Sequence, residues 1–213
     1  MDIDNDGKLE ILSGCIPGEV YCFHRKADAT WAAPQVLKAA GGQQLNAGRA
    51  SAVVSADWNG DGKTDLLIGN IEGAVFVVLN KGTREKPLWS EPEKLKADGK
   101  PIIAEGQRAG PFVADWDGDG KPDLVLGSGS GKVVWYRNTG MATNPKLTLA
   151  GTLIDAPPQK RLETDESPKR PGQCTKVCVA DWNGDGRPDL VVGDDNAFGT
   201  NTYRGFVWVC LRK

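Results

Sequence analysis

Short apolar runs recur along this chain in a fixed order, and the order is repeated four times. In each unit, a run that ends in Gly follows a polar loop: EILSG, DLLIG, DLVLG or DLVVG. A turn then leads to a segment with the alternating pattern of a strand: EVYCFHR, AVFVVLN, KVVWYRN or FVWVCLR. Short runs rich in β-branched and aromatic residues are typical of β-strands. The pattern therefore predicts an all-β protein.

Two further strands complete the repeating unit. The apolar segment before the loop, as in SAVVSADW, GPFVADW and KVCVADW, predicts an innermost strand buried between its neighbours. The segment from Trp31 to Lys38 matches the one from Trp89 to Lys96 and predicts an outer edge strand, where Pro is tolerated. Units of several short strands, spaced here by 55, 58 and 66 residues, are typical of propeller blades.

The sequence thus predicts a β-propeller of about four blades in one domain that spans residues 1–213. We expect the blades at roughly 1–46, 47–104, 105–158 and 173–213, with Pro-rich residues 157–172 as a surface loop and 194–203 as a second insertion. The first unit lacks an innermost strand and the last lacks an outer one. We therefore interpret the propeller as incomplete or part of a larger one. Two chains that complete one ring are the alternative.

The polar loop has the same nine-residue pattern in every unit. Oxygen-bearing side chains stand at positions 1, 3, 5 and 9, and Gly at position 6 permits a tight turn. Calcium takes about six to eight oxygen ligands and favours carboxylates, amide oxygens and backbone carbonyls. We therefore expect about four Ca²⁺ ions, one in each loop. Their ligands would be the four side chains and the carbonyl at position 7: Asp2, Asp4, Asp6, Lys8 and Glu10; Asp57, Asn59, Asp61, Lys63 and Asp65; Asp115, Asp117, Asp119, Lys121 and Asp123; Asp181, Asn183, Asp185, Arg187 and Asp189.

Other interpretations of the loop fit less well. A turn that binds nothing would leave several carboxylates repelling one another, and four matched copies argue against it. An EF-hand or dockerin loop needs a bidentate Glu at position 12 and a helix after it. Ser13, Ile68, Leu126 and Val192 stand at position 12, inside predicted strands. Magnesium is less suitable because it demands a stricter octahedron and keeps its waters.

The pattern D-x-[DN]-x-D-G-x-x-[DE]-L-x-x-G resembles the FG-GAP/VCBS repeat of integrin-α-type β-propellers and many bacterial surface proteins. The resemblance covers nearly the whole chain in four copies. It implies calcium at the loop residues named above. It also implies an extracellular or periplasmic location, where calcium is abundant enough to fill sites of modest affinity.

Composition adds limits on partners. With 213 residues, 39% apolar and 25% charged, the chain is expected to be globular. Half of its 28 acidic residues lie in the four loops, so four bound Ca²⁺ would move the formal net charge from −2 to about +6. No dense basic stripe with interleaved aromatics is present, so nucleic acid is not an expected partner. No apolar run is long enough for a membrane span. Because Met1 stands directly before the first loop, the sequence predicts no signal peptide.

Residues with reactive or aromatic side chains give weaker signals. The five cysteines, Cys15, Cys22, Cys174, Cys178 and Cys210, have no metal-binding spacing and predict buried apolar side chains or one long-range disulfide. The single histidine, His24, is expected to be an inert surface residue. Trp at position 2 of three loops, Trp58, Trp116 and Trp182, predicts packing between blades, with stacking on a carbohydrate as the alternative.

No catalytic pairing of Ser, His, Cys or Asp is visible in the sequence, and the loop carboxylates would be used as metal ligands. We therefore expect a non-catalytic, calcium-binding propeller module whose partner is a glycan or a surface protein. Two alternatives stay open. The chain could be an accessory domain or fragment of a polysaccharide-degrading enzyme, or it could be a structural spacer.

Overall fold

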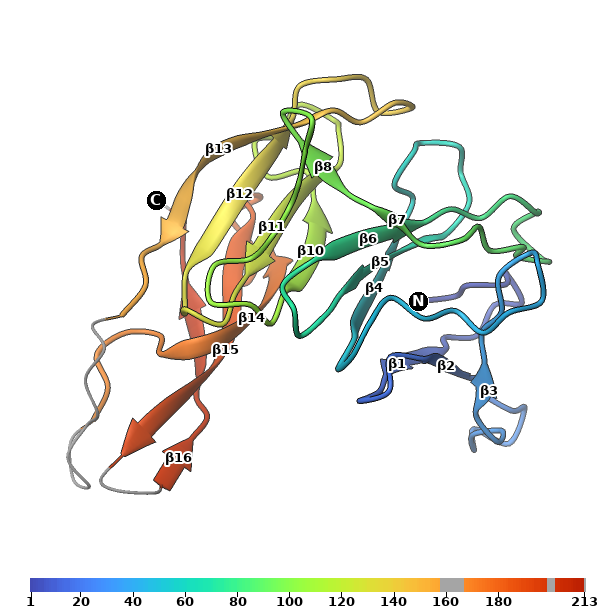
Figure 1. The fold of residues 1–213 in the computed structure, drawn as a ribbon, viewed down its shortest axis with the longest axis horizontal. Helices are drawn as coiled ribbons and strands as arrows, with labels where there is room; N and C mark the ends of the chain where they lie inside the picture. Colours follow the sequence, from blue (N-terminus) through green and yellow to red (C-terminus); the bar gives the residue numbers. More distant parts are fainter. Residues whose placement is uncertain (158–166, 199–201, 213) are drawn as a thin grey trace.

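The computed structural model describes residues 1–157, 167–198 and 202–212. Within these ranges the chain forms seventeen β-strands in four separate sheets, arranged as a four-bladed β-propeller (Figure 1). The predicted all-β propeller with about four blades is confirmed. None of the described residues forms a helix that could cross a membrane.

The four sheets follow one another along the chain. The first contains β1 (Ile11–Gly14), β2 (Val20–Phe23) and β3 (Gln35–Val36), and the second contains β4 (Ala52–Ala56), β5 (Asp65–Gly69), β6 (Val75–Val78) and β7 (Glu93–Lys94). The third contains β10 (Gly110–Ala114), β11 (Asp123–Gly127), β12 (Val133–Asn138) and β13 (Leu147–Ile154), extended by β8 (Lys96–Ala97) and β9 (Lys100–Pro101). The fourth contains β14 (Gln173–Ala180), β15 (Asp189–Phe198), β16 (Thr202–Arg204) and β17 (Val207–Cys210).

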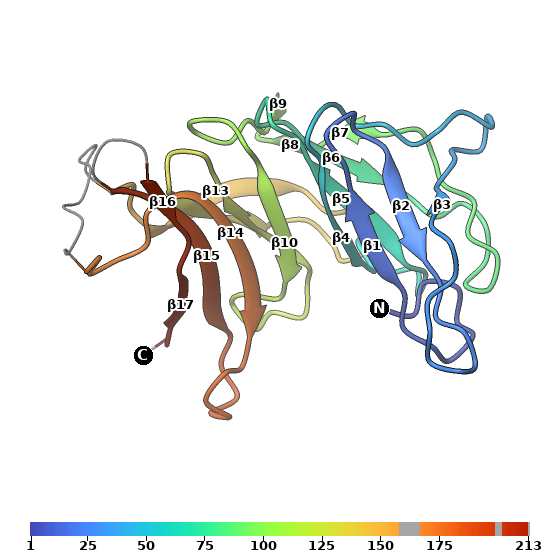
Figure 2. The ribbon, with the colours of Figure 1, turned by 90° about the horizontal axis from the view of Figure 1, so that it is seen from below.

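The innermost strands β4, β10 and β14 lie side by side around the middle of the propeller (Figure 2). In the first sheet β1 takes this place, since β1, β4, β10 and β14 together line a central cavity of about 340 Å³. Each innermost strand pairs antiparallel with the next strand in the same register: Ala56 with Asp65, Ala114 with Asp123 and Ala180 with Asp189. The polar loop therefore closes the same hairpin in each of these three sheets.

Apolar side chains fill the spaces between successive sheets. Leu67 and Val77 of the second sheet pack with Leu124 and Leu126 of the third. Separate clusters join the first sheet to the second and the third to the fourth. The propeller is therefore held together by three inter-sheet cores, which combine residues of the predicted strands with residues outside them, such as Leu45 and Ile102.

In the first three sheets, each of which is followed by another sheet, the residue at position 2 of the loop is part of these cores. Ile3, Trp58 and Trp116 are buried in the first-to-second, second-to-third and third-to-fourth clusters. Trp182 is 62% exposed. The predicted inter-blade packing is thus confirmed for Trp58 and Trp116 and wrong for Trp182, because no described sheet packs against that side of the fourth.

Glycine at the end of the second strand permits neighbouring sheets to approach closely. A Cβ atom on Gly69 would lie 2.5 Å from the backbone oxygen of Ala109, and one on Gly127 would lie 2.5 Å from that of Thr175. Both distances are too short for a side chain. Gly69 and Gly127 therefore have a packing role that the sequence pattern had not assigned, whereas Gly193 of the fourth sheet has nothing within 4 Å of an added Cβ.

Some connections differ from expectation. The β8–β9 hairpin follows the second sheet in sequence but pairs with β13 of the third, through Leu147 and Ala97. The insertion at 194–203 contributes the end of β15 and the first residues of β16, and these two strands pair with each other. Residues 199–201 are not described. Most of the predicted loop 157–172, namely 158–166, lies outside the described residues. All five cysteines are free thiols in the structure.

Candidate metal-binding loops

The carboxylate at position 1 holds each loop in its tight turn. Asp115 accepts hydrogen bonds from the backbone nitrogens of Gly118, Asp119 and Gly120 at 2.8, 3.0 and 2.8 Å. Gly120 has φ +82°, a conformation that L side chains rarely adopt. Asp2, Asp57 and Asp181 accept equivalent bonds in the other loops. The loop is therefore preorganised by its own backbone.

The acid at position 9 is buried at the start of the second strand. Asp123 accepts bonds through Oδ2 from the nitrogen of Trp116 at 3.2 Å and the indole of Trp135 at 3.0 Å, and through Oδ1 from the nitrogen of Asn138 at 2.7 Å. The equivalent bond joins Asp65 to Asn80 and Asp189 to Arg212, which lie two residues past the ends of β6 and β17. These carboxylates tie the loop to two strands as well as offering oxygens to an ion.

A basic residue at position 7 pairs with the carboxylate at position 5 in every loop. The side-chain nitrogens of Lys8, Lys63, Lys121 and Arg187 lie 2.7 to 3.1 Å from Asp6, Asp61, Asp119 and Asp185, respectively. The backbone N–H groups of the same four residues donate to those carboxylates. Their carbonyl oxygens, which we expect as ligands, belong to the same turn.

The residue at position 3 divides the loops into two kinds. Asn59 and Asn183 donate from Nδ2 to the carboxylate at position 5, at 3.2 and 3.0 Å. Asp117 instead forms an ion pair with Arg137 of β12, whose Nε lies 2.6 Å from Asp117 Oδ2. Arg137 also lies 3.1 Å from Asp119 through Nη2. Sequence reasoning missed this arginine, which comes from a different strand of the same sheet.

Burial and ion pairing move the pKa values of these acids in opposite directions. Burial raises the pKa of Asp65 and Asp123, although their hydrogen bonds offset part of the effect. The hydrogen bond from Arg187 lowers the pKa of Asp185 to about 2. Hydrogen bonds from Lys121 and Lys8 likewise lower the pKa of Asp119 and Asp6. The acids at position 5 are therefore anionic at neutral pH and available to a cation.

Two of the loops bring three carboxylates within ligand distance of one another. The closest oxygens of Asp2, Asp4 and Asp6 lie within 4.8 Å, as do those of Asp115, Asp117 and Asp123. In the first loop, Asp4 Oδ1 is buried and has no hydrogen-bond partner. A donor set made of oxygens, with one buried oxygen left without a partner, fits a hard divalent cation.

The repeat that carries these loops matches known family models along most of the chain. A model described as FG-GAP-like repeat matches residues 2–68, 57–125 and 115–192, and one described as FG-GAP repeat matches residues 175–210. The chain belongs to the FG-GAP repeat family. Each FG-GAP match contains at least one of the four loops and the strand that follows it. The sequence repeat and the observed sheet therefore have the loop in common.

Several proteins are similar to this FG-GAP chain over part of their length. Integrin alpha-7 of Rattus norvegicus is 29% identical over 144 residues, which cover 61% of this chain and 12% of that protein. Integrin alpha-4 of Xenopus laevis is 34% identical over 120 residues, covering 51% and 11%. Phosphatidylinositol-glycan-specific phospholipase D of Bos taurus is 30% identical over 179 residues, covering 73% and 20%. The chain thus spans a fifth or less of each of these relatives.

A solved structure also resembles the FG-GAP propeller. It is that of an Agrocybe aegerita lectin that recognises non-reducing terminal N-acetylglucosamine. The match covers 99% of this chain and 56% of the lectin chain, with 18% sequence identity and a TM-score of 0.47.

Proposed function

We propose that this chain is a non-catalytic propeller module that holds one Ca²⁺ in each of its four loops and binds a glycan or a protein outside the cell or in the periplasm. One observation carries the proposal. The same oxygen-rich loop closes the same hairpin in successive sheets and is wound around its first carboxylate by backbone hydrogen bonds. A loop repeated in this way suits a structural ion better than a catalytic one, because catalysis needs one open site.

The calcium part of the proposal is supported by the chemistry of the loops. Up to four carboxylates lie within nine residues, and the basic side chain at position 7 pairs with only one of them. In the third loop Arg137 pairs with two of the carboxylates. An ion bound at the centre would neutralise the remaining charge and join two strands of each sheet. It would thereby stabilise the folded chain by RT ln(1 + [L]/Kd) for each site.

Calorimetry and elemental analysis test the calcium assignment. The metal-free chain should take up about four Ca²⁺, and EGTA should lower its Tm reversibly. Asp119→Ala and Asp61→Ala should each remove one ion from the count. Asp155→Ala changes an exposed acid outside the loops and should leave the count unchanged. A parent protein that binds no calcium, with a Tm indifferent to EGTA, would overturn the assignment.

The partner site is proposed at the opposite end of the propeller. A hollow of about 640 Å³ lies beside the second sheet, where β5 ends and the chain turns into β6, and it is also lined by residues 46–49, which lead into β4. Its lining combines the ring of Phe76 with the amide side chains of Asn46 and Asn70 and the exposed Arg49–Glu72 ion pair. An apolar surface with a few polar groups around it is typical of ligand sites.

Glycan arrays and binding to immobilised surface proteins test the partner site. The double variant Arg49→Ala/Glu72→Ala removes the ion pair at the rim of the hollow and should abolish the binding seen with the parent. Lys81→Ala/Glu85→Ala removes one exposed base and one exposed acid at the metal end and should bind normally. Equal binding by both double variants would place the partner elsewhere.

A second candidate function is that of an accessory domain or fragment of an enzyme. The matched segment in phosphatidylinositol-glycan-specific phospholipase D supports it, because that enzyme carries a segment similar to 73% of this chain. Hydrolysis of polysaccharides or phosphodiesters by the purified chain, abolished by a single substitution outside the four loops, would favour this function over the first.

A further inference from the structure

One residue that follows the strand beside each loop, or lies near its end, changes together with the residue at position 3 of that loop. Strand pairing aligns Phe23, Val78, Tyr136 and Cys210, each of which lies opposite the residue that follows the acid at position 9. The next residues along the chain are therefore equivalent: His24, Leu79, Arg137 and Leu211. Where position 3 is Asp, this residue is a base. Where position 3 is Asn, it is Leu.

The two bases meet their partners differently. Arg137 approaches Asp117 at 2.6 Å and also reaches Asp119, so its guanidinium satisfies both carboxylates. His24 Nδ1 lies 3.5 Å from Asp4 Oδ2, a distance too long for a good hydrogen bond. The other oxygen, Asp4 Oδ1, is buried without a partner. The carboxylate of Asp4 in the first loop therefore lacks the close cationic partner that Arg137 provides for Asp117 in the third loop.

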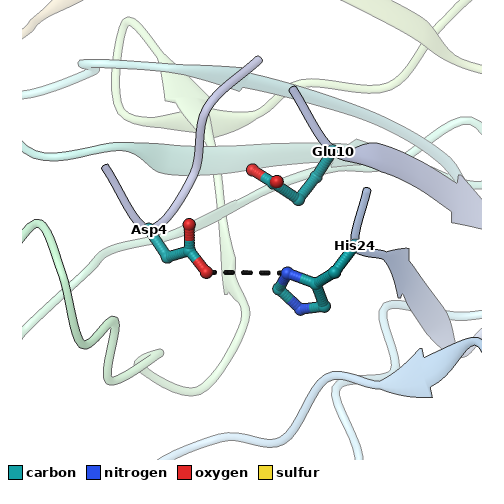
Figure 3. A group of neighbouring side chains, drawn as sticks. All are labelled: Asp4, Glu10 and His24. Atoms are coloured by element: carbon teal, nitrogen blue, oxygen red, sulfur yellow. Dashed lines mark ion pairs between the residues drawn. The ribbon is translucent and has the colours of Figure 1, made fainter. Parts of the chain in front are cut away.

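The acid at position 9 also differs in the first loop. Glu10 replaces the Asp of the other three and is 6% exposed. Glu10 Oε2 accepts a bond from Ile3 at 2.9 Å, as expected for this position. Figure 3 shows the carboxylates of Asp4 and Glu10 and the imidazole of His24 pointing toward a common space. One ligand atom from each of the three lies within 4.8 Å of the others.

We propose that Asp4, Glu10 and His24 form a binding site for a borderline transition-metal ion such as Zn²⁺, distinct in selectivity from the oxygen-only loops. The proposal rests on the proposed function and deepens it: the first loop, which would take Ca²⁺ when no other divalent ion is present, would take Zn²⁺ in preference when both are present. Calcium prefers oxygen ligands, whereas zinc binds imidazole nitrogen together with carboxylates. Ligands of a tetrahedral zinc with bonds of about 2.1 Å lie about 3.4 Å apart, close to the 3.5 Å between His24 and Asp4.

A neighbouring thiol supports the orientation of the imidazole. His24 Nε2 lies 3.6 Å from Cys22 Sγ, on the side of the ring away from Asp4. A histidine that binds a metal through one ring nitrogen commonly donates its other N–H to a nearby acceptor, which fixes the ring. With Nδ1 on the metal, Nε2–H would donate to the sulfur of Cys22.

The competing explanation is that His24 is a charge partner of Asp4, as Arg137 is of Asp117. His24→Arg separates the two, since arginine keeps the charge and copies the third loop but cannot bind zinc. His24→Leu copies the second and fourth loops instead and removes both properties. Each variant therefore introduces a side chain that already occurs at the equivalent position of another sheet: Arg137 for the first variant, and Leu79 and Leu211 for the second.

The decisive experiment uses the chain's single histidine as its own probe. The full chain, free of any histidine tag and stripped of metal, is labelled with ¹⁵N-histidine and titrated with Zn²⁺ in the presence of saturating Ca²⁺. One equivalent of Zn²⁺ should shift the ring nitrogen signals of His24, and Ca²⁺ alone should not move them to the same position. His24→Arg and His24→Leu should each bind one Zn²⁺ fewer than the parent.

The proposal is overturned if Zn²⁺ leaves the His24 signals unchanged, or if a folded His24→Arg chain binds as much Zn²⁺ as the parent. The spectral result on the parent does not depend on how the variants fold. Calcium stoichiometry is counted separately. A chain that binds no calcium but shifts the His24 signals with one Zn²⁺ would refute the calcium assignment while sustaining this one.

Discussion

Asp123 Oδ1 lies 2.7 Å from the backbone nitrogen of Asn138, so the last acid of the third loop is bonded to the end of the third strand of its sheet. Its other oxygen accepts two further bonds, from Trp116 and Trp135. A residue chosen by sequence as a metal ligand is thus also a structural bridge among three segments. Its two roles can be separated by experiment.

Asp123→Ala should destabilise the chain even when no metal is present. Each buried donor left without an acceptor costs about 1–3 kcal/mol, and this substitution leaves three without their carboxylate, so we expect a loss of about 3 kcal/mol or more. Urea unfolding in EGTA measures the loss. Asp155→Ala, at an exposed acid, is the control and should change stability by less than about 0.5 kcal/mol. Equal stability of the two variants would contradict the bridging role.

Gly120→Val should destabilise through the backbone alone. Gly120 has φ +82° and nothing within 4 Å of its added Cβ, so the added Cβ meets no neighbour and the backbone conformation is the source of the cost. A β-branched residue in this conformation costs about 1–3 kcal/mol. Gly151→Ala is the matched control, because it also has open space around the added Cβ but no positive φ. Thermal unfolding of the two variants should show a lower Tm for the first alone, and Gly62→Val and Gly186→Val should behave like Gly120→Val.

Lys121→Met should raise the affinity of the third loop for calcium. Lys121 Nζ lies 3.0 Å from Asp119 Oδ2, where it competes with an ion for the same carboxylate. Ion pairs that solvent can reach contribute little, so we expect a gain in affinity of about fivefold or less. Calorimetric titration measures it, with Lys100→Met, at an exposed lysine outside the loops, as the control. A weaker affinity after Lys121→Met would show that the lysine helps to form the site.

Cys22 and Cys178 should differ strongly in reactivity. Burial raises the pKa of Cys22 to about 12, and its side chain is fully buried, whereas Cys178 is exposed. The thiolate is the reactive form, so iodoacetamide at pH 8 should alkylate Cys178 at least tenfold faster in the native chain. Peptide mass spectrometry measures both rates, and the urea-unfolded chain, in which the two should react alike, is the control. Comparable native rates would contradict the packing of β2.

The same burial predicts a dependence of stability on pH. The unfolded Cys22 thiol ionises near its ordinary value of 9.0, while the folded thiol stays protonated until about pH 12. The folded state therefore binds more protons between these values, and the contribution of Cys22 to stability is complete below pH 9 and is lost as the pH rises toward 12. Metal-free urea unfolding of the parent and Cys22→Ala tests this. The stability advantage of the parent should shrink over that range.

Much of this protein is determined by local sequence. The DLxxG runs and the alternating segments predict their strands because side-chain alternation and β-branched residues act within a few positions along the chain. The loops are predicted equally well, since Asp115 and Gly120 form their turn with residues no more than five positions apart. The inter-blade burial of Trp58 and Trp116 also follows from the repeat.

Other features depend on segments that meet only in the folded chain. The ion pair of Asp117 with Arg137 and the approach of His24 to Asp4 come from pairing between different strands, so loop spacing alone does not contain them. The exposure of Trp182 depends on which sheet lies next to it, although its local sequence matches that of Trp116. Local patterning therefore decides where strands and turns form. The tertiary structure decides which charges are neutralised and which apolar faces are covered, because both depend on neighbours that are distant in sequence.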